Sequence, residues 1–167
     1  MDQDLTDRIV GRLSQIYPEL DLRDTHVTAR LSRLGRHMAL REEEVFGRFG
    51  LGRGDVGVLS ALRMAGPPHR LSPTRLGKGL MLSSAGVTSR LDRLERRGLV
   101  ARHPDPDDRR GIIVELTELG RELVNAAVTA NAAKDRELLG QLTREQRTTL
   151  EDLLRTLLVG LEGQQGG

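Results

Sequence analysis

Small polar residues followed by arginines occupy one stretch of the chain, residues 83–97. Hydroxyl and guanidinium groups donate hydrogen bonds to phosphate oxygens and base edges, and small side chains let a helix come close to the bases. At 3.6 residues per turn, Val87, Leu91 and Leu94 share one face and predict a buried seam. We therefore expect a helix with a nucleic-acid-binding face, although a merely solvated charged helix is the alternative. The candidate contacts are Ser83, Ser84, Ala85, Thr88, Ser89, Arg90 and Arg93.

A basic turn follows this helix. Residues 99–102 and 111–116 read as two strands, and the residues between them are rich in proline and aspartate and end in Arg109 and Arg110. Asp107 and Asp108 would repel DNA, so we expect one carboxylate to hold an arginine while Arg109 or Arg110 projects. Insertion of Arg110 into a narrow A·T minor groove and simple phosphate contact are both open.

The elements around these residues suggest how they are positioned. Ser72 and Pro73 have the N-cap and N1 residue types of a short helix before Ser83. Helix, turn, helix and a basic-tipped β-ribbon form the layout of a winged DNA-binding domain, in which one helix enters the major groove. We predict a fold that is mainly α with a small β-wing.

Long helices are predicted on both sides of this domain. We expect N-terminal dimerisation helices in residues 1–50, the winged helix-turn-helix domain in 51–117, C-terminal dimerisation helices in 118–160 and a disordered tail in 161–167. The apolar faces of the flanking helices exceed what a winged domain of about 60 residues could cover. A homodimer interlocked through these helices is the favoured interpretation, and a monomeric helical cap is the alternative.

Charge is distributed unevenly along the chain. The formal net charge is only +2, but Arg75 to Arg110 contain nine Lys/Arg against five Asp/Glu. Residues 1–50 and 111–167 each carry slightly more acidic than basic residues. A basic centre between acidic ends is typical of a DNA-facing patch.

Other functional classes find little support. There is no cysteine, and the four histidines at 26, 37, 69 and 103 lack the spacing of metal ligands. No phosphate-binding loop or nucleophile motif is visible, so we expect no enzyme, cofactor or metal. No apolar run approaches the ~20 residues that span a membrane, and no secretory signal is visible. We expect a soluble, cytoplasmic protein.

The chain resembles the MarR family of winged-helix regulators over nearly its whole length. The residues that carry this resemblance are the run from Leu82 to Val100, Asp108-Arg109-Arg110-Gly111, and the run from Val114 to Gly120. The resemblance implies a homodimer that binds a pseudo-palindromic operator, usually represses, and releases DNA when a small ligand binds. It also implies that Arg110 is the wing-tip arginine and that Asp108 is its supporting carboxylate.

The chain has an extra N-terminal helix before Asp24, and this helix is similar to one in the PecS-like, urate-responsive branch of the family. That branch places a tryptophan in this helix and an aspartate in the helix after Gly50-Leu51-Gly52. Leu13 and Gly57 stand at those positions here. Both polar contacts are missing, so the sequence does not predict urate as the effector.

The effector is the least defined part of the prediction. Arg30, His37 and Met38 are candidate pocket residues on the long helix before Phe49, and a phenolic or carboxylate metabolite is the ligand class considered. An architectural DNA-binding protein without an effector is the alternative function. A protein-interaction adaptor that no longer binds DNA is a third.

Overall fold

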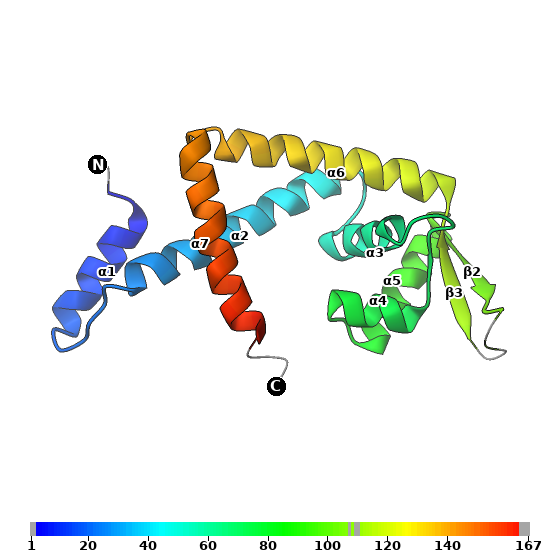
Figure 1. Ribbon diagram of the computed structural model, residues 1–167, viewed down its shortest axis with the longest axis horizontal. Helices are drawn as coiled ribbons and strands as arrows, with labels where there is room; N and C mark the ends of the chain where they lie inside the picture. The colour runs from blue at the N-terminus through cyan, green and yellow to red at the C-terminus, as the bar shows by residue number, and fades with distance from the viewer. Residues whose placement is uncertain (1–2, 107, 109–110, 164–167) are drawn as a thin grey trace.

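The computed structural model describes residues 3–106, 108 and 111–163. Two long helices run from a compact winged domain toward a second region, where the first and last helices lie (Figure 1). The elements, in chain order, are α1 (Leu5–Ile16), α2 (Thr25–Gly47), α3 (Arg53–Met64), β1 (Arg70–Leu71), α4 (Pro73–Leu80), α5 (Ser84–Arg96), β2 (Val100–Pro104), β3 (Ile112–Leu116), α6 (Glu118–Leu139) and α7 (Arg144–Gly163).

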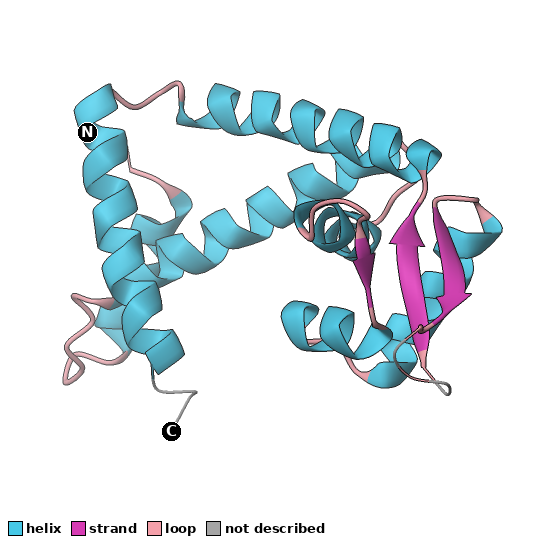
Figure 2. Ribbon diagram, turned by 45° about the vertical axis from the view of Figure 1, so that its right-hand side comes forward, coloured by secondary structure: helices cyan, strands magenta, loops and turns pink. Residues whose placement is uncertain are grey.

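The sheet has three antiparallel strands in the order β1-β3-β2 (Figure 2). Val100 faces Leu116 across the hairpin, and Arg70 faces Glu115 on the other side of β3. The β2–β3 hairpin confirms the predicted wing, with strands shifted by one or two residues from the expected ranges. The sequence interpretation missed β1, because a two-residue strand has no periodicity and is defined only by pairing with distant residues.

One hydrophobic core holds the winged domain together. It joins the end of α2, one face each of α3, α4 and α5, strands β2 and β3, and the first half of α6. The predicted seam of α5 lies within it, since Val87, Leu91 and Leu94 are all buried. The amphipathic period therefore identified the correct face of α5.

The start of α6 packs unusually closely on the domain. Thr117 caps this helix by accepting a hydrogen bond from Gly120 N at 3.0 Å, and its hydroxyl donates to Gly98 O at 2.7 Å. A Cβ atom on Gly120 would overlap the Leu99 carbonyl oxygen and lie 2.9 Å from the Leu116 side chain. Only glycine allows this contact between α6 and the first residues of the wing.

The last helix corrects the expected tail. α7 continues to Gly163, so the prediction of disorder was wrong for residues 161–163, and residues 164–167 lie outside the described residues. Leu161 extends the apolar repeat of this helix past Gly160, whose cost in a helix is only about 1 kcal/mol. Thr143 and Gln146 form a capping box at the start of α7 through reciprocal hydrogen bonds.

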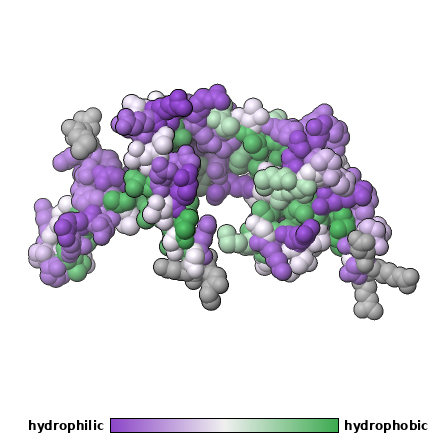
Figure 3. Space-filling view, viewed as in Figure 1, coloured by the Kyte–Doolittle hydropathy of each residue, from purple (hydrophilic) through white to green (hydrophobic). Residues whose placement is uncertain are grey.

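The first and last helices leave apolar side chains uncovered. No residue of α7 is buried, and Leu153, Leu157, Leu158 and Leu161 are each 50–60% exposed. Leu5, Ile9 and Ile16 of α1 are exposed as well. Figure 3 shows this hydrophobic surface among hydrophilic residues where α7 crosses α2. Among the described helices, none combines the length and apolar character needed to cross a membrane.

Replacement of Gly120 by alanine should destabilise the protein by about 3 kcal/mol, because the added methyl group meets a backbone carbonyl that cannot move independently. Urea denaturation monitored by circular dichroism would measure this loss. Gly11→Ala is the matched control, since a Cβ at Gly11 has no atom within 4 Å. Equal stability of the Gly120→Ala variant and the native chain would contradict the close-contact argument.

Candidate nucleic-acid interface

The beginning of α5 presents a small, polar surface. Ser83 caps the helix by accepting a hydrogen bond from Gly86 N at 3.2 Å. Ser84, Ala85, Thr88 and Ser89 are exposed. This surface can approach a duplex closely, because none of its side chains extends far from the helix.

The end of α5 is fixed by a Schellman motif. Gly98 has a φ of +67°, a conformation that glycine adopts without steric cost. Gly98 N donates to Glu95 O at 2.8 Å, and Leu99 N donates to Leu94 O at 3.0 Å. The chain therefore leaves α5 directly into β2, which places the wing beside this helix.

The wing side of α5 is braced by one arginine. Arg102 of β2 donates to Asp92 at 2.6 Å and to Glu95 at 2.9 Å. Both carboxylates belong to α5, so the guanidinium ties the helix to the wing. Charge-assisted hydrogen bonds of this kind are stronger than those between neutral groups.

The opposite side of α5 is braced against α3. The Asp55 side chain, only 3% exposed, forms an ion pair with Arg93. Its second oxygen accepts a hydrogen bond from Gly52 N at 3.0 Å and caps α3. Sequence analysis missed Asp55 as a site residue, although its position three residues after Gly52 is a capping signal.

Two further arginines, Arg90 of α5 and Arg97 directly after this helix, turn toward the same region. Arg90 donates to Gly86 O at 3.1 Å and lies so close to Gly54 that a Cβ there would overlap its guanidinium. Arg97 donates to Gly50 O at 2.5 Å and to Phe49 O at 3.2 Å. Arg97 thus holds the turn between α2 and α3, while Arg90 lies against the first turn of α3.

These contacts place the predicted site residues in two groups. Ser83, Ser84, Ala85, Thr88 and Ser89 lie together at the exposed beginning of α5. Arg90 and Arg93 lie at its α3 side, where each is already in contact with that helix. Arg93 remains 48% exposed, so part of its guanidinium faces solvent.

Only part of the predicted wing tip can be located. Gly111 N donates to Asp108 O at 2.8 Å, and Asp105 N donates to Gly111 O at 3.0 Å, which closes the turn. Arg109 and Arg110 lie outside the described residues. Their roles, and the support expected from Asp108, stay predictions.

The three candidate effector residues are not gathered in one place. Arg30 donates to Asp4 at 2.9 Å and to Asp7 at 2.7 Å, joining α2 to α1. The hydrogen bond from Arg30 lowers the pKa of the Asp7 carboxyl below its ordinary value. His37 is exposed. Met38 lines an apolar groove of about 550 Å³ between α2, α6 and α7, together with Leu34, Leu138, Leu139, Leu150 and Leu154.

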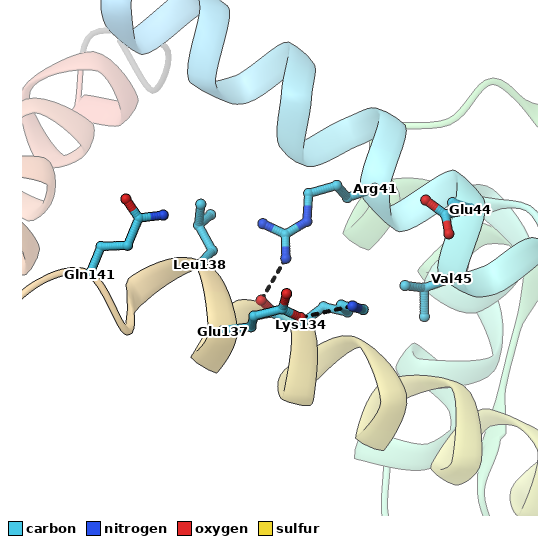
Figure 4. Close-up of a pocket in the computed structure, with 7 residues that line it drawn as sticks. All are labelled: Arg41, Glu44, Val45, Lys134, Glu137, Leu138 and Gln141. Carbon is cyan, nitrogen blue, oxygen red and sulfur yellow. Dashed lines mark hydrogen bonds and ion pairs between the residues drawn. The ribbon is translucent and has the colours of Figure 1, made fainter.

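A smaller pocket of about 310 Å³ lies between α2 and α6 (Figure 4). Its cationic groups already have partners within the chain. Arg41 donates to Lys134 O at 2.7 Å, and the Lys134 ammonium lies 2.8 Å from the Glu137 carboxylate. The Arg41 contact ties α2 to α6, and because both cations have partners the pocket is a poor match for an anionic ligand.

Comparison with known proteins agrees with this geometry. The sequence profile of the MarR family matches residues 49–111. The HTH-type transcriptional regulator PecS of Dickeya dadantii strain 3937 is 34% identical over 137 residues, which cover 82% of each chain. Such relatives are named as transcriptional regulators or repressors and not as enzymes.

Solved structures show the same fold. Sco3205 of Streptomyces coelicolor in complex with DNA, a MarR family regulator, matches with a TM-score of 0.73 and 25% identity, covering 85% of this chain and 89% of that one. A mutant of MarR from E. coli, complexed with operator DNA, matches with a TM-score of 0.66 and 26% identity over 93% and 99% of the two chains. The chain belongs to the MarR family of DNA-binding transcriptional regulators.

Proposed function

We propose that this MarR-family regulator binds a pseudo-palindromic operator as a homodimer, represses transcription and releases the DNA when a small ligand binds. The observation that carries the proposal is the exposed, small-residue beginning of α5, braced on one side by Arg102 and on the other by Asp55. A helix held rigidly on both sides loses little freedom when it enters a major groove.

In this proposal the contacts divide into two kinds. Ser84, Ala85, Thr88 and Ser89 face base edges, while Ser83 at the helix N-terminus and Arg90 and Arg93 at the α3 side contact phosphates. Arg109 and Arg110 at the wing reach the adjacent minor groove or backbone, with Asp108 supporting Arg110. The protein acts in the cytoplasm, where its operator DNA is found.

Dimerisation follows from the uncovered helices. The proposed N-terminal and C-terminal helices, in residues 1–50 and 118–160 with the extension of α7 to Gly163, pair with those of a second copy. Burying several leucines on each side contributes roughly 1.5–3 kcal/mol per fully covered side chain. Two copies present two α5 helices, as a pseudo-palindrome requires.

The DNA-binding prediction is tested by selecting duplexes of about 30 base pairs from a random pool with the native chain. We expect enrichment of a pseudo-palindromic sequence bound by two chains. Arg90→Ala and Arg110→Ala should each weaken binding to the selected duplex by about tenfold and reduce the slope of affinity against salt by about one. Affinity unchanged in both variants would overturn this assignment. Salt-dependent binding without sequence preference would favour the architectural alternative.

The dimer is tested by a charge placed on the apolar face of α7. Leu157→Glu should shift the protein from dimer to monomer in sedimentation at micromolar concentration, because an unpaired carboxylate would be buried between the helices. Thr148→Glu, nine residues earlier and therefore on the opposite side of α7, is the matched control and should remain a dimer. A monomeric native chain would contradict the proposal itself.

For the effector, we propose the groove around Met38 as the binding site of a phenolic or carboxylate metabolite, since its lining is mainly apolar and can hold an aromatic ring. Its charged residues are Asp135, Glu151 and Arg147, and Arg147 also donates to Leu142 O at 3.2 Å. A thermal-shift screen of such metabolites should find a compound that raises the Tm of the native chain and not of a Met38→Glu variant. An equal rise in both proteins would place the effector elsewhere, and Arg30 and His37 would then be the next positions to vary.

A further inference from the structure

The first turn of α3 is shaped to receive arginines from α5. Gly54 lies directly under the Arg90 guanidinium: a Cβ at Gly54 would overlap Arg90 Nε and lie 2.9 Å from Cζ and Nη2. The next residue, Asp55, holds Arg93 through its buried carboxylate. Space and charge for two arginines are thus supplied by adjacent residues of one helix turn.

The seating of Arg90 is specific in two respects. The Arg90 guanidinium lies so close to Gly54 that any side chain at position 54 would displace it. Its Nη1 also donates to Gly86 O at 3.1 Å, which fixes the in-plane orientation of the group. The Arg90 residue as a whole is half-buried, so part of it remains accessible to solvent.

Arg93 is held in place for a different reason, the free-energy cost of leaving the buried Asp55 carboxylate without a counter-charge. If Arg93 moved away to a phosphate, the Asp55 carboxylate would stay buried with its charge uncompensated, which is strongly unfavourable. Arg93 therefore keeps its contact with Asp55. A guanidinium has five N–H donors, so the exposed part of Arg93 retains donors for a second partner.

We propose that Gly54 is a positioning residue for DNA binding: it holds the guanidinium group of Arg90 in place, beside the Arg93 that Asp55 holds, before the duplex arrives. The proposal rests on the proposed function, because this preorganisation matters only if α5 contacts DNA. Ordering a long side chain on binding costs affinity. Filling the space over Gly54 therefore weakens binding by displacing the Arg90 guanidinium, without removing any group that contacts the duplex.

Gly54→Ala is the decisive variant, because it moves the Arg90 guanidinium while leaving Arg90 itself unchanged. We expect its affinity for the duplex selected by the native chain to fall about three- to tenfold. Gly57→Ala is the matched control, since it makes the same change in the same helix and its Cβ meets only Leu80 at an ordinary 3.5 Å. It should bind like the native chain.

A double-mutant cycle separates positioning from a general structural effect. In an Arg90→Ala background, Gly54→Ala should cause no further loss of affinity, because no guanidinium remains to be displaced. Arg90→Lys provides a second route, since a single ammonium nitrogen keeps the charge but cannot both lie against Gly54 and donate to Gly86 O as the guanidinium does. It should lose affinity like Gly54→Ala. Melting curves without DNA verify that each variant is folded at the assay temperature.

The outcomes distinguish this inference from the proposed function. If the native chain and Gly57→Ala select and bind a duplex but Gly54→Ala and Arg90→Lys bind it equally well, the positioning role is wrong and the proposed function stands. An additive loss in the double mutant would also overturn the positioning role. If the native chain selects no duplex, the proposed function itself fails.

Discussion

A single buried carboxylate connects the parts of this molecule that have to stay in register. Asp55 caps α3 through Gly52 N and pairs with Arg93 of α5, and both contacts use the same side chain. A buried charge is tolerated only when it is paired and hydrogen-bonded, so losing either contact would be strongly unfavourable in free energy. Asp55 therefore holds the turn after α2, the start of α3 and the second half of α5 together, and Arg102 ties the wing to α5 from the other side.

Local patterns in the sequence were sufficient for most of the fold. The apolar period identified the buried face of α5, and Ser72 with Pro73 marked the start of α4, which the structure confirms. Interactions between residues far apart in the chain could not be predicted from such local patterns. Strand β1 exists only through β3, and the Arg93–Asp55 pair spans 38 positions, so neither leaves a periodic signal. The contact between Arg90 and Gly54 was missed for the same reason, since a glycine in the sequence of α3 does not indicate which distant side chain lies against it.

The chain combines a well-packed end with a poorly covered one. The winged domain buries its apolar residues in one continuous core, whereas α7 buries none and α1 buries only Thr6 and Val10. Such a contrast is expected when one region folds by itself and another is completed by a partner surface. The few aromatic residues, 2% of the chain, fit this division, because helices with leucine faces can pair without large rings.

The length of α2 gives the molecule a mechanical property. Its 23 residues form an uninterrupted rod of roughly 35 Å, one end beside α1 and the other joined to the turn that Arg97 grips. For a rod of this length, a tilt of about five degrees moves the far end by about 3 Å, close to the rise of one base pair. A tilt of this size, if repacking of the terminal helices produced it, would displace the winged domain by about one base-pair step along a duplex.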